Sequence, residues 1–211
     1  MKDLRGVLLA IVLLLGGIGC ASFPGKDLPK YSYDQIKPPA PQPCIDYDAK
    51  FLTMGRENAR GVAIFQEEIE KVFRQSNFFQ KHSPGVGSGD YHFSMVLQNE
   101  GNMCLAGISG FISGLTLTII PGYAKDEYIL TVDVKKEGEV LKQYQYRHYM
   151  DTWIQLFMIF LTATHNPQEV ARQVIDDMLL NFLHDLEKDQ ILVQSPKIFY
   201  ASSPTSRGGG D

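Results

Sequence analysis

The sequence has few of the residues that build metal and redox sites. Its 211 residues include three cysteines, one tryptophan and five histidines. No HExxH pattern and no closely spaced pair of cysteines is present, so the usual ligand spacings of a zinc site are missing. A Walker phosphate loop and a GxSxG nucleophile motif are missing too. We therefore expect a protein that is not an enzyme and that holds no metal or cofactor.

Positive charge is also scarce. The chain has 20 Lys and Arg against 24 Asp and Glu, which gives a net charge of −4, and the basic residues form no stripe. Nucleic acid is therefore not an expected partner. Charge alone would not hold this chain on an anionic membrane surface.

The N-terminus reads as a secretory signal. Lys2 and Arg5 precede an apolar run over residues 6–15, and small residues follow before Cys20. A short basic start, about ten apolar residues and small residues before a cut site are typical of a signal peptide rather than of a membrane span. Residues 1–19 are the predicted signal peptide.

Cys20 resembles the lipidated cysteine of bacterial lipoproteins, which follows small residues and becomes the new N-terminus. This resemblance implies a lipid anchor at Cys20. Because Ala21 rather than Asp follows, it also implies the outer membrane, with the domain facing the periplasm. Gly17 stands where the lipoprotein pattern favours Leu, so secretion into the periplasm, with cleavage after Ala21, is the alternative.

Three further segments follow the signal. Residues 20–43 contain six prolines, which favour an extended and solvated backbone, and we expect an anchor and tether that hold the domain off the membrane. Residues 44–192 form one predicted domain, which is long enough for a sizeable core. Residues 193–211 are a predicted flexible tail.

Hydrophobic periodicity predicts the elements of that domain. Apolar residues recur at helical spacing over 59–76, and Asn166-Pro167 is a strong start for a second helix ending near 188. Alternating apolar and polar residues predict strands over 91–98, 115–120, 127–135 and 140–148. The expected fold is α+β, with an antiparallel four-stranded sheet and two main helices packed on one face.

Cys44 and Cys104 would remain in an oxidising compartment once Cys20 carries lipid. A disulfide between them would close a loop of about sixty residues and stabilise the fold by roughly 4 kcal/mol. Two buried free thiols are the alternative.

Two apolar stretches stand out from the rest of the domain. Met103 to Tyr123 has no charged residue over 21 positions, which is long enough to span a membrane. Its glycines, hydroxyl residues and alternating second half instead favour a glycine-rich loop that leads into a strand and that a partner's backbone could approach closely.

The second stretch, Trp153 to Ala163, has eleven residues and cannot span a bilayer as a helix. It would be buried in its own core, in a partner or second copy, or shallowly in a membrane beside the anchor, with Trp153 at the interface. Trp153, Phe157 and Phe160 are the candidate partner or membrane surface.

The segment Ser113 to Tyr123, followed by Tyr128 to Val132, resembles a group of small uncharacterised bacterial envelope lipoproteins. In these a GLTL-x-(I/L)-P strand precedes a Y-x-L-T strand. The order of elements is more distantly similar to the α/β lipoprotein domains of curli-secretion, polysaccharide-export and TolB N-terminal type. The resemblance implies a fold and an envelope location, and it carries over no catalytic residue.

These features together predict a lipid-anchored, non-enzymatic envelope lipoprotein. It would bind protein partners, or copies of itself, in secretion, export or envelope maintenance. The expected contact surface is Trp153 to Ala163 with the loop Gly107 to Gly114. The alternative is a periplasmic binding module that holds a lipid or another apolar small molecule between its sheet and helices.

Overall fold

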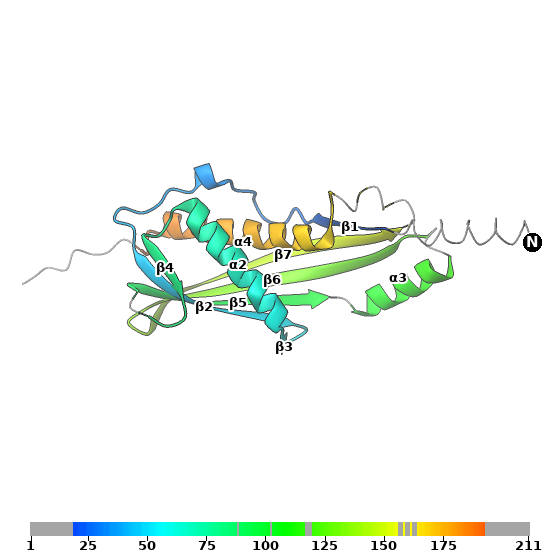
Figure 1. Cartoon of the computed structure of the whole chain (residues 1–211), viewed down its shortest axis with the longest axis horizontal. Coiled ribbons are helices and arrows are strands. Elements are labelled where there is room, and N and C mark those ends of the chain that lie inside the picture. Colours follow the sequence, from blue (N-terminus) through cyan, green and yellow to red (C-terminus); the bar gives the residue numbers. More distant parts are fainter. Residues whose placement is uncertain are drawn as a thin grey trace, which may run out of the picture.

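The computed structural model describes residues 19–87, 89–101, 103–116, 120–155, 158, 161 and 164–192, with the backbone alone for 103–106. In this part of the chain, a long mixed sheet carries two long helices on one face (Figure 1). The α+β class is as predicted. Apart from Gly19, the predicted signal peptide lies outside the described residues, as does the predicted tail.

Seven strands and three α-helices make up the described part of the chain. The strands are β1 (Gly19–Pro24), β2 (Cys44–Thr53), β3 (Arg56–Glu57), β4 (Lys81–Pro84), β5 (Tyr91–Gly101), β6 (Gly122–Lys136) and β7 (Glu139–Gln155). The helices are α2 (Ala59–Ser76), α3 (Met103–Leu115) and α4 (Pro167–Asp189), with a short 3-10 helix, η1, at Tyr33–Gln35.

The sheet is larger than predicted and is not purely antiparallel. Its strand order is β1-β7-β6-β5-β2-β3, and β4 also pairs with β2. β2 runs parallel to β5 and β4, whereas the other pairs are antiparallel. The prediction of four antiparallel strands is therefore wrong. α2 follows β2 and crosses over the sheet before β5 begins, and a crossover connection of this kind joins parallel strands.

The two long helices lie where the sequence predicts them. Asn58 caps α2, because its Oδ1 accepts a hydrogen bond from the Gly61 amide at 3.0 Å. Asn166 caps α4 in the same way, through the Gln168 amide at 2.9 Å. Each cap satisfies an amide that would otherwise lack an intrahelical acceptor.

The core lies between the sheet and these two helices. Phe93 of β5 is fully buried, and its ring contacts Phe79, Phe73 and Phe182 edge-on at centroid distances of 5.7, 6.5 and 5.5 Å. Alternate residues of β5 face this core, as its alternating pattern predicts. Edge-to-face pairs of this kind add about 0.5–1.5 kcal/mol each beyond area burial.

The apolar stretch Met103 to Tyr123 does not form the predicted loop and strand. Residues 103–115 are α3, and β6 begins only at Gly122. The expected strand over 115–120 is therefore wrong at its start, and residues 117–119 lie outside the described residues. Ser109, Ser113 and Thr116 recur at helical spacing, so this stretch also satisfies a 3.6-residue period.

The proline-rich segment is packed on the domain rather than free in solvent. Residues 19–24 form edge strand β1, which pairs with β7 along its whole length. The rest, residues 25–43, which we call the strap, passes over α4 (Figure 1). Asn181 Nδ2 donates to the Pro29 carbonyl at 2.8 Å, and the Tyr31 ring stacks on His184 at 4.1 Å. The prediction of a solvated tether is therefore wrong, because α4 supplies partners for an otherwise unpaired extended backbone.

Candidate functional site

Cys20, the predicted lipidation site, lies in β1, an edge strand of the sheet. It pairs with Ile154 of β7, which in turn pairs with Gly122 of β6. Its thiol is free and half-buried. With neighbouring strands about 4.8 Å apart, the Cα atoms of Cys20 and Gly122 are about 10 Å apart.

Contacts on both sides hold β1 in place. The Ser22 hydroxyl lies 2.7 Å from the Thr152 hydroxyl, and the Ser22 amide donates to the His165 carbonyl at 2.9 Å. The Phe23 ring lies 4.7 Å from the His165 ring. Because β1 is paired from Gly19 onward, the position of Cys20 is set by the sheet.

α3 is attached to the same end of the sheet through its hydroxyl face. Ser109 Oγ donates to the Tyr123 carbonyl at 2.6 Å and accepts from the Tyr123 amide at 2.8 Å. Ser113 is buried, and a Cβ atom added to Gly122 would lie 3.3 Å from the Cβ atom of Ser113. α3 therefore approaches the backbone of β6 at Gly122. Gly122 pairs with Ile154, and Ile154 pairs with Cys20.

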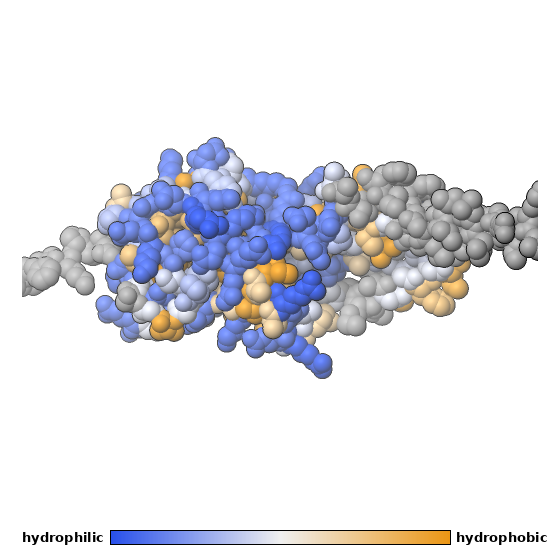
Figure 2. Space-filling view, in the orientation of Figure 1, coloured by the Kyte–Doolittle hydropathy of each residue, from blue (hydrophilic) through white to orange (hydrophobic). Residues whose placement is uncertain are grey.

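The opposite side of α3 is exposed and apolar. Ile108, Phe111, Ile112 and Leu115 are 58, 68, 43 and 70% exposed. Their spacing of three, four and seven residues puts them on one side of the helix. We call these four residues the apolar face of α3. Figures 1 and 2 place α3 and its hydrophobic surface at the end of the molecule that carries β1.

Trp153, the first residue of the second apolar stretch, lies in a strand. It belongs to β7, is 36% exposed, and its ring lies 4.8 Å from the Tyr123 ring. The Tyr123 hydroxyl donates to Asp151 at 2.5 Å, and this hydrogen bond raises the pKa of Tyr123 to about 12. The other two residues of the predicted surface, Phe157 and Phe160, lie outside the described residues.

The predicted disulfide is not formed. Cys44 has a free thiol at the start of β2, beside Asp90 at the near end of β5. Cys104 is in α3, beyond the far end of β5. The ten-residue run of β5 between these ends covers about 33 Å, whereas disulfide-linked Cα atoms lie within about 7 Å of each other. Sequence spacing alone did not reveal this separation.

A cavity of about 470 Å³ opens between the N-terminal halves of α2 and α4. Its apolar lining includes Phe51, Ile64, Met150 and Ile175. Asn99 and Arg60 are among its polar residues; no hydrogen bond or ion pair joins the Arg60 guanidinium to another described residue. The volume is within the range of small-molecule sites.

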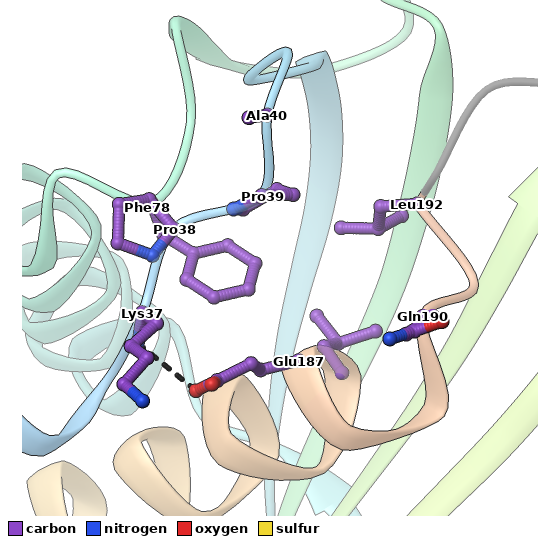
Figure 3. A pocket seen from close by; sticks show the side chains of 9 residues that line it. Lys37, Pro38, Pro39, Ala40, Phe78, Glu187, Gln190 and Leu192 are labelled. Atoms are coloured by element: carbon purple, nitrogen blue, oxygen red, sulfur yellow. Dashed lines mark hydrogen bonds between the residues drawn. The ribbon is translucent and has the colours of Figure 1, made fainter.

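A smaller cavity of about 240 Å³ lies under the strap at the other end of α4 (Figure 3). The Phe78 ring points into it from one side, and Leu192 faces it from the other. The Lys37 amide donates to Glu187 at 2.9 Å across its edge. This cavity is a gap between the strap and the domain. It lies at the C-terminal end of α4, whereas Asn166 caps the N-terminal end.

Ion pairs join α2 to α4. Glu68, 1% exposed, lies 2.5 Å from Lys71 Nζ and also pairs with Arg172. Lys71 Nζ is also 2.5 Å from Asp176. Burial raises the pKa of Asp176 to about 7. Glu67 accepts from Arg172 at 2.9 Å. Each acid has a basic partner, so the cluster holds two helices together.

The polar groups of the described residues show no recognisable catalytic arrangement. The buried His148 approaches Asp177 at 3.7 Å, which is too long for a hydrogen bond, and neither residue lines the larger cavity. Within these same residues, no cluster of three or more acidic, histidine or cysteine side chains could hold a metal ion. No helix in the described part of the chain has the length and apolarity needed to cross a membrane.

No protein-family model and no curated protein matches the chain. Among solved structures, it is similar to a PelC variant from Paraburkholderia phytofirmans that forms a dodecamer, with 9% identity and a TM-score of 0.36 over 78% of this chain and 97% of that one. It is also similar to a DUF330 protein from Xanthomonas campestris, with 9% identity and a TM-score of 0.38 over 74% and 91%. A third is a candidate lipoprotein from Caulobacter crescentus, with 10% identity and a TM-score of 0.36 over 67% and 91%. At these identities and TM-scores, the similarities establish neither a family nor a function for this chain.

Proposed function

We propose that this chain is a lipid-anchored, non-enzymatic protein of the bacterial envelope, attached to the outer membrane through Cys20. It acts by binding other molecules in secretion, export or envelope maintenance. The observation that carries the proposal is the position of Cys20 within β1, at the end of the molecule that also carries the apolar face of α3. An acyl chain on Cys20 would therefore hold the apolar face of α3 close to the membrane.

The polar clusters support a binding role over catalysis. The acids and bases between α2 and α4 are paired with one another, and the buried His148 lines neither of the two cavities. An active site needs a base or nucleophile that can reach a substrate. The described part of the chain therefore offers surfaces and a cavity for binding, and we propose no catalytic role for its polar groups.

A fatty-acid label tests the anchor. Cells expressing the wild-type protein, Cys20→Ala or Cys44→Ala would be grown with an alkyne analogue of palmitate, and the purified proteins compared. We expect labelling of the wild type and of the Cys44→Ala control, and loss of label in Cys20→Ala. Labelling of Cys20→Ala, or no labelling of the wild type, would refute attachment through Cys20.

Crosslinking in intact cells tests for a protein partner. A variant with Trp153→Ala removes an aromatic ring from the end that carries α3, whereas Val140→Ala removes an exposed apolar side chain from the β6–β7 hairpin. We expect the first variant, and not the second, to lose crosslinked partners. If both variants keep the same crosslinked partners and remain folded, this end of the molecule is not part of the partner interface.

The larger cavity supports a second candidate function, which is binding of an apolar small molecule. Ala171→Phe places a ring in that cavity, and Ala63→Phe places one on the exposed side of α2 as a control. The wild type and the control should bind the apolar dye N-phenyl-1-naphthylamine, and Ala171→Phe should bind it at least tenfold more weakly. Equal binding by all three proteins would exclude the cavity as the site.

A further inference from the structure

We infer that the apolar face of α3 inserts into the lipid surface to which Cys20 is attached, and so sets the orientation of the domain on the membrane. The inference rests on the proposed function, because it takes Cys20 as the acylated residue. It adds a second contact with the membrane and names the occupant of the exposed face as lipid.

The first support is the short and rigid path from Cys20 to α3. Cys20 pairs with Ile154, Ile154 pairs with Gly122, and Gly122 meets Ser113 of α3. Every step is a strand pairing or a packed contact. Because the proline-rich segment is packed on the domain, no flexible spacer separates the anchor from the sheet. An acyl chain in the bilayer therefore brings this end of the sheet to the membrane surface.

The chemistry of α3 fits lipid better than a protein partner. From Met103 to Tyr123 the sequence has no charged residue. Specific protein interfaces commonly surround an apolar centre with a polar rim. A surface without charge can instead enter the hydrocarbon region of a bilayer without burying a charged group. The polar atoms of this helix point the other way, since Ser109 and Ser113 face β6. Lipid would cover four exposed side chains and leave the hydroxyl face in its present contacts.

The size of the helix defines the kind of insertion. Its 13 residues cover about 20 Å, less than the roughly 30 Å thickness of the hydrocarbon core, so it cannot cross the membrane. An apolar face on one side of such a helix suits a position in the plane of the interface, buried about 5–10 Å deep. Ser109 of the helix bonds the backbone of Tyr123, whose ring packs against Trp153, and such rings are common at the level of the lipid headgroups.

The single tryptophan makes a direct test possible. Trp153→Phe removes the native fluorophore, and Phe111→Trp or Val140→Trp then introduces one reporter at an exposed apolar position. Position 111 is on the apolar face of α3. Position 140 lies at the far hairpin, about 45 Å away along β7. The acylated proteins would be reconstituted into dioleoylphosphatidylcholine vesicles with plain or brominated acyl chains.

We expect brominated lipid to reduce the fluorescence at position 111 about twofold, because bromine quenches tryptophan at the depth of an interfacial helix. The reporter at position 140 should be equally bright in both lipids. Equal brightness at position 111 would overturn the inference. A blue-shifted reporter at position 111 in lipid-free solution, together with a dimer mass, would overturn it in favour of a second copy of this chain.

The experiments distinguish failure of the anchor hypothesis from failure of the insertion hypothesis. Loss of Cys20 acylation appears in the fatty-acid labelling experiment and would refute the proposed function. The Cys20→Ala protein, added to the same vesicles, tests α3 without any acyl chain. Quenching at position 111 in that protein would support insertion even if the anchor is refuted. Labelled Cys20 with an unquenched reporter would keep the anchor and refute insertion.

Discussion

Replacement of Asp176 by asparagine should remove a pH dependence of stability that the wild-type protein shows between about pH 5 and 8. Asp176 Oδ2 lies 2.5 Å from Lys71 Nζ, and its other oxygen is buried with no described hydrogen-bond partner. Burial raises the pKa of this carboxyl from 3.8 to about 7, although the hydrogen bond from Lys71 acts in the opposite direction.

The sign follows from which state holds the proton more tightly. The folded protein keeps the Asp176 proton until about pH 7, whereas the unfolded chain loses it near 3.8. Stability is therefore lost as the pH rises through this interval. Each pKa unit is worth ~1.4 kcal/mol, so the interval from about pH 5 to 7 accounts for ~2.7 kcal/mol. Solvent contact at a side chain that is 21% exposed reduces the expected loss to about 2 kcal/mol.

Glu68 changes the stability in a different pH range. Burial acts to raise its pKa, but hydrogen bonds from Lys71 and Arg172 outweigh burial and leave the pKa below its usual value of 4.5. Its stabilising contribution is complete above that value and is lost only at lower pH. The range from about pH 5 to 8 therefore lies above the one in which Glu68 loses its contribution.

Urea denaturation measures the effect. The free energy of unfolding would be measured from about pH 5 to 8 by Trp153 fluorescence and circular dichroism, using the non-acylated Cys20→Ala protein with and without Asp176→Asn. We expect the advantage of the asparagine variant to grow by about 2 kcal/mol across this range. Asp133→Asn, on the open sheet face beside Gln143, is the control for loss of a carboxylate elsewhere. Equal pH slopes with and without Asp176→Asn would refute the reasoning.

Two glycines and one serine provide further tests. Gly61→Ala should reduce the free energy of unfolding by about 1–3 kcal/mol in urea denaturation, because its Cβ would overlap the Phe51 ring; unchanged stability would show that the ring moves aside freely. Gly107→Ala, in α3 where a Cβ would meet nothing, should stabilise the helix by roughly 0.5–1 kcal/mol and slow its amide exchange, and faster exchange would contradict this. Ser109→Ala should speed exchange of the Tyr123 amide about tenfold, because that amide loses its acceptor; an unchanged rate would mean that α3 does not depend on this contact.

The parts of the fold that could be predicted depend on local signals. Caps and helical periodicity place α2 and α4, because each cap bonds an amide within three residues of itself. Strict alternation places β5, because successive side chains of a strand face opposite sides. These signals are contained in a few neighbouring residues and need no knowledge of the rest of the chain.

The parts that were missed depend on distant contacts. The apolar stretch that forms α3 satisfies both a two-residue and a helical period, and the contacts of Ser109 and Ser113 with β6 favour the helix. The strap resembles a solvated linker until Asn181 and His184 of α4 are brought against it. Proline content indicates an extended backbone, but not whether another part of the chain covers it.

The sequence by itself determined the two long amphipathic helices and the absence of charge from Met103 to Tyr123, and it predicts a leader that ends before Cys20. Only the tertiary structure decided that Cys20 belongs to a strand and that the uncharged segment lies beside it. The physical reason is the range of the interactions. Helical periodicity acts over a few residues, whereas the contact of Ser22 with Thr152 joins positions 130 apart in the chain. That pairing brings the predicted anchor and the exposed face of α3 to one end of the molecule.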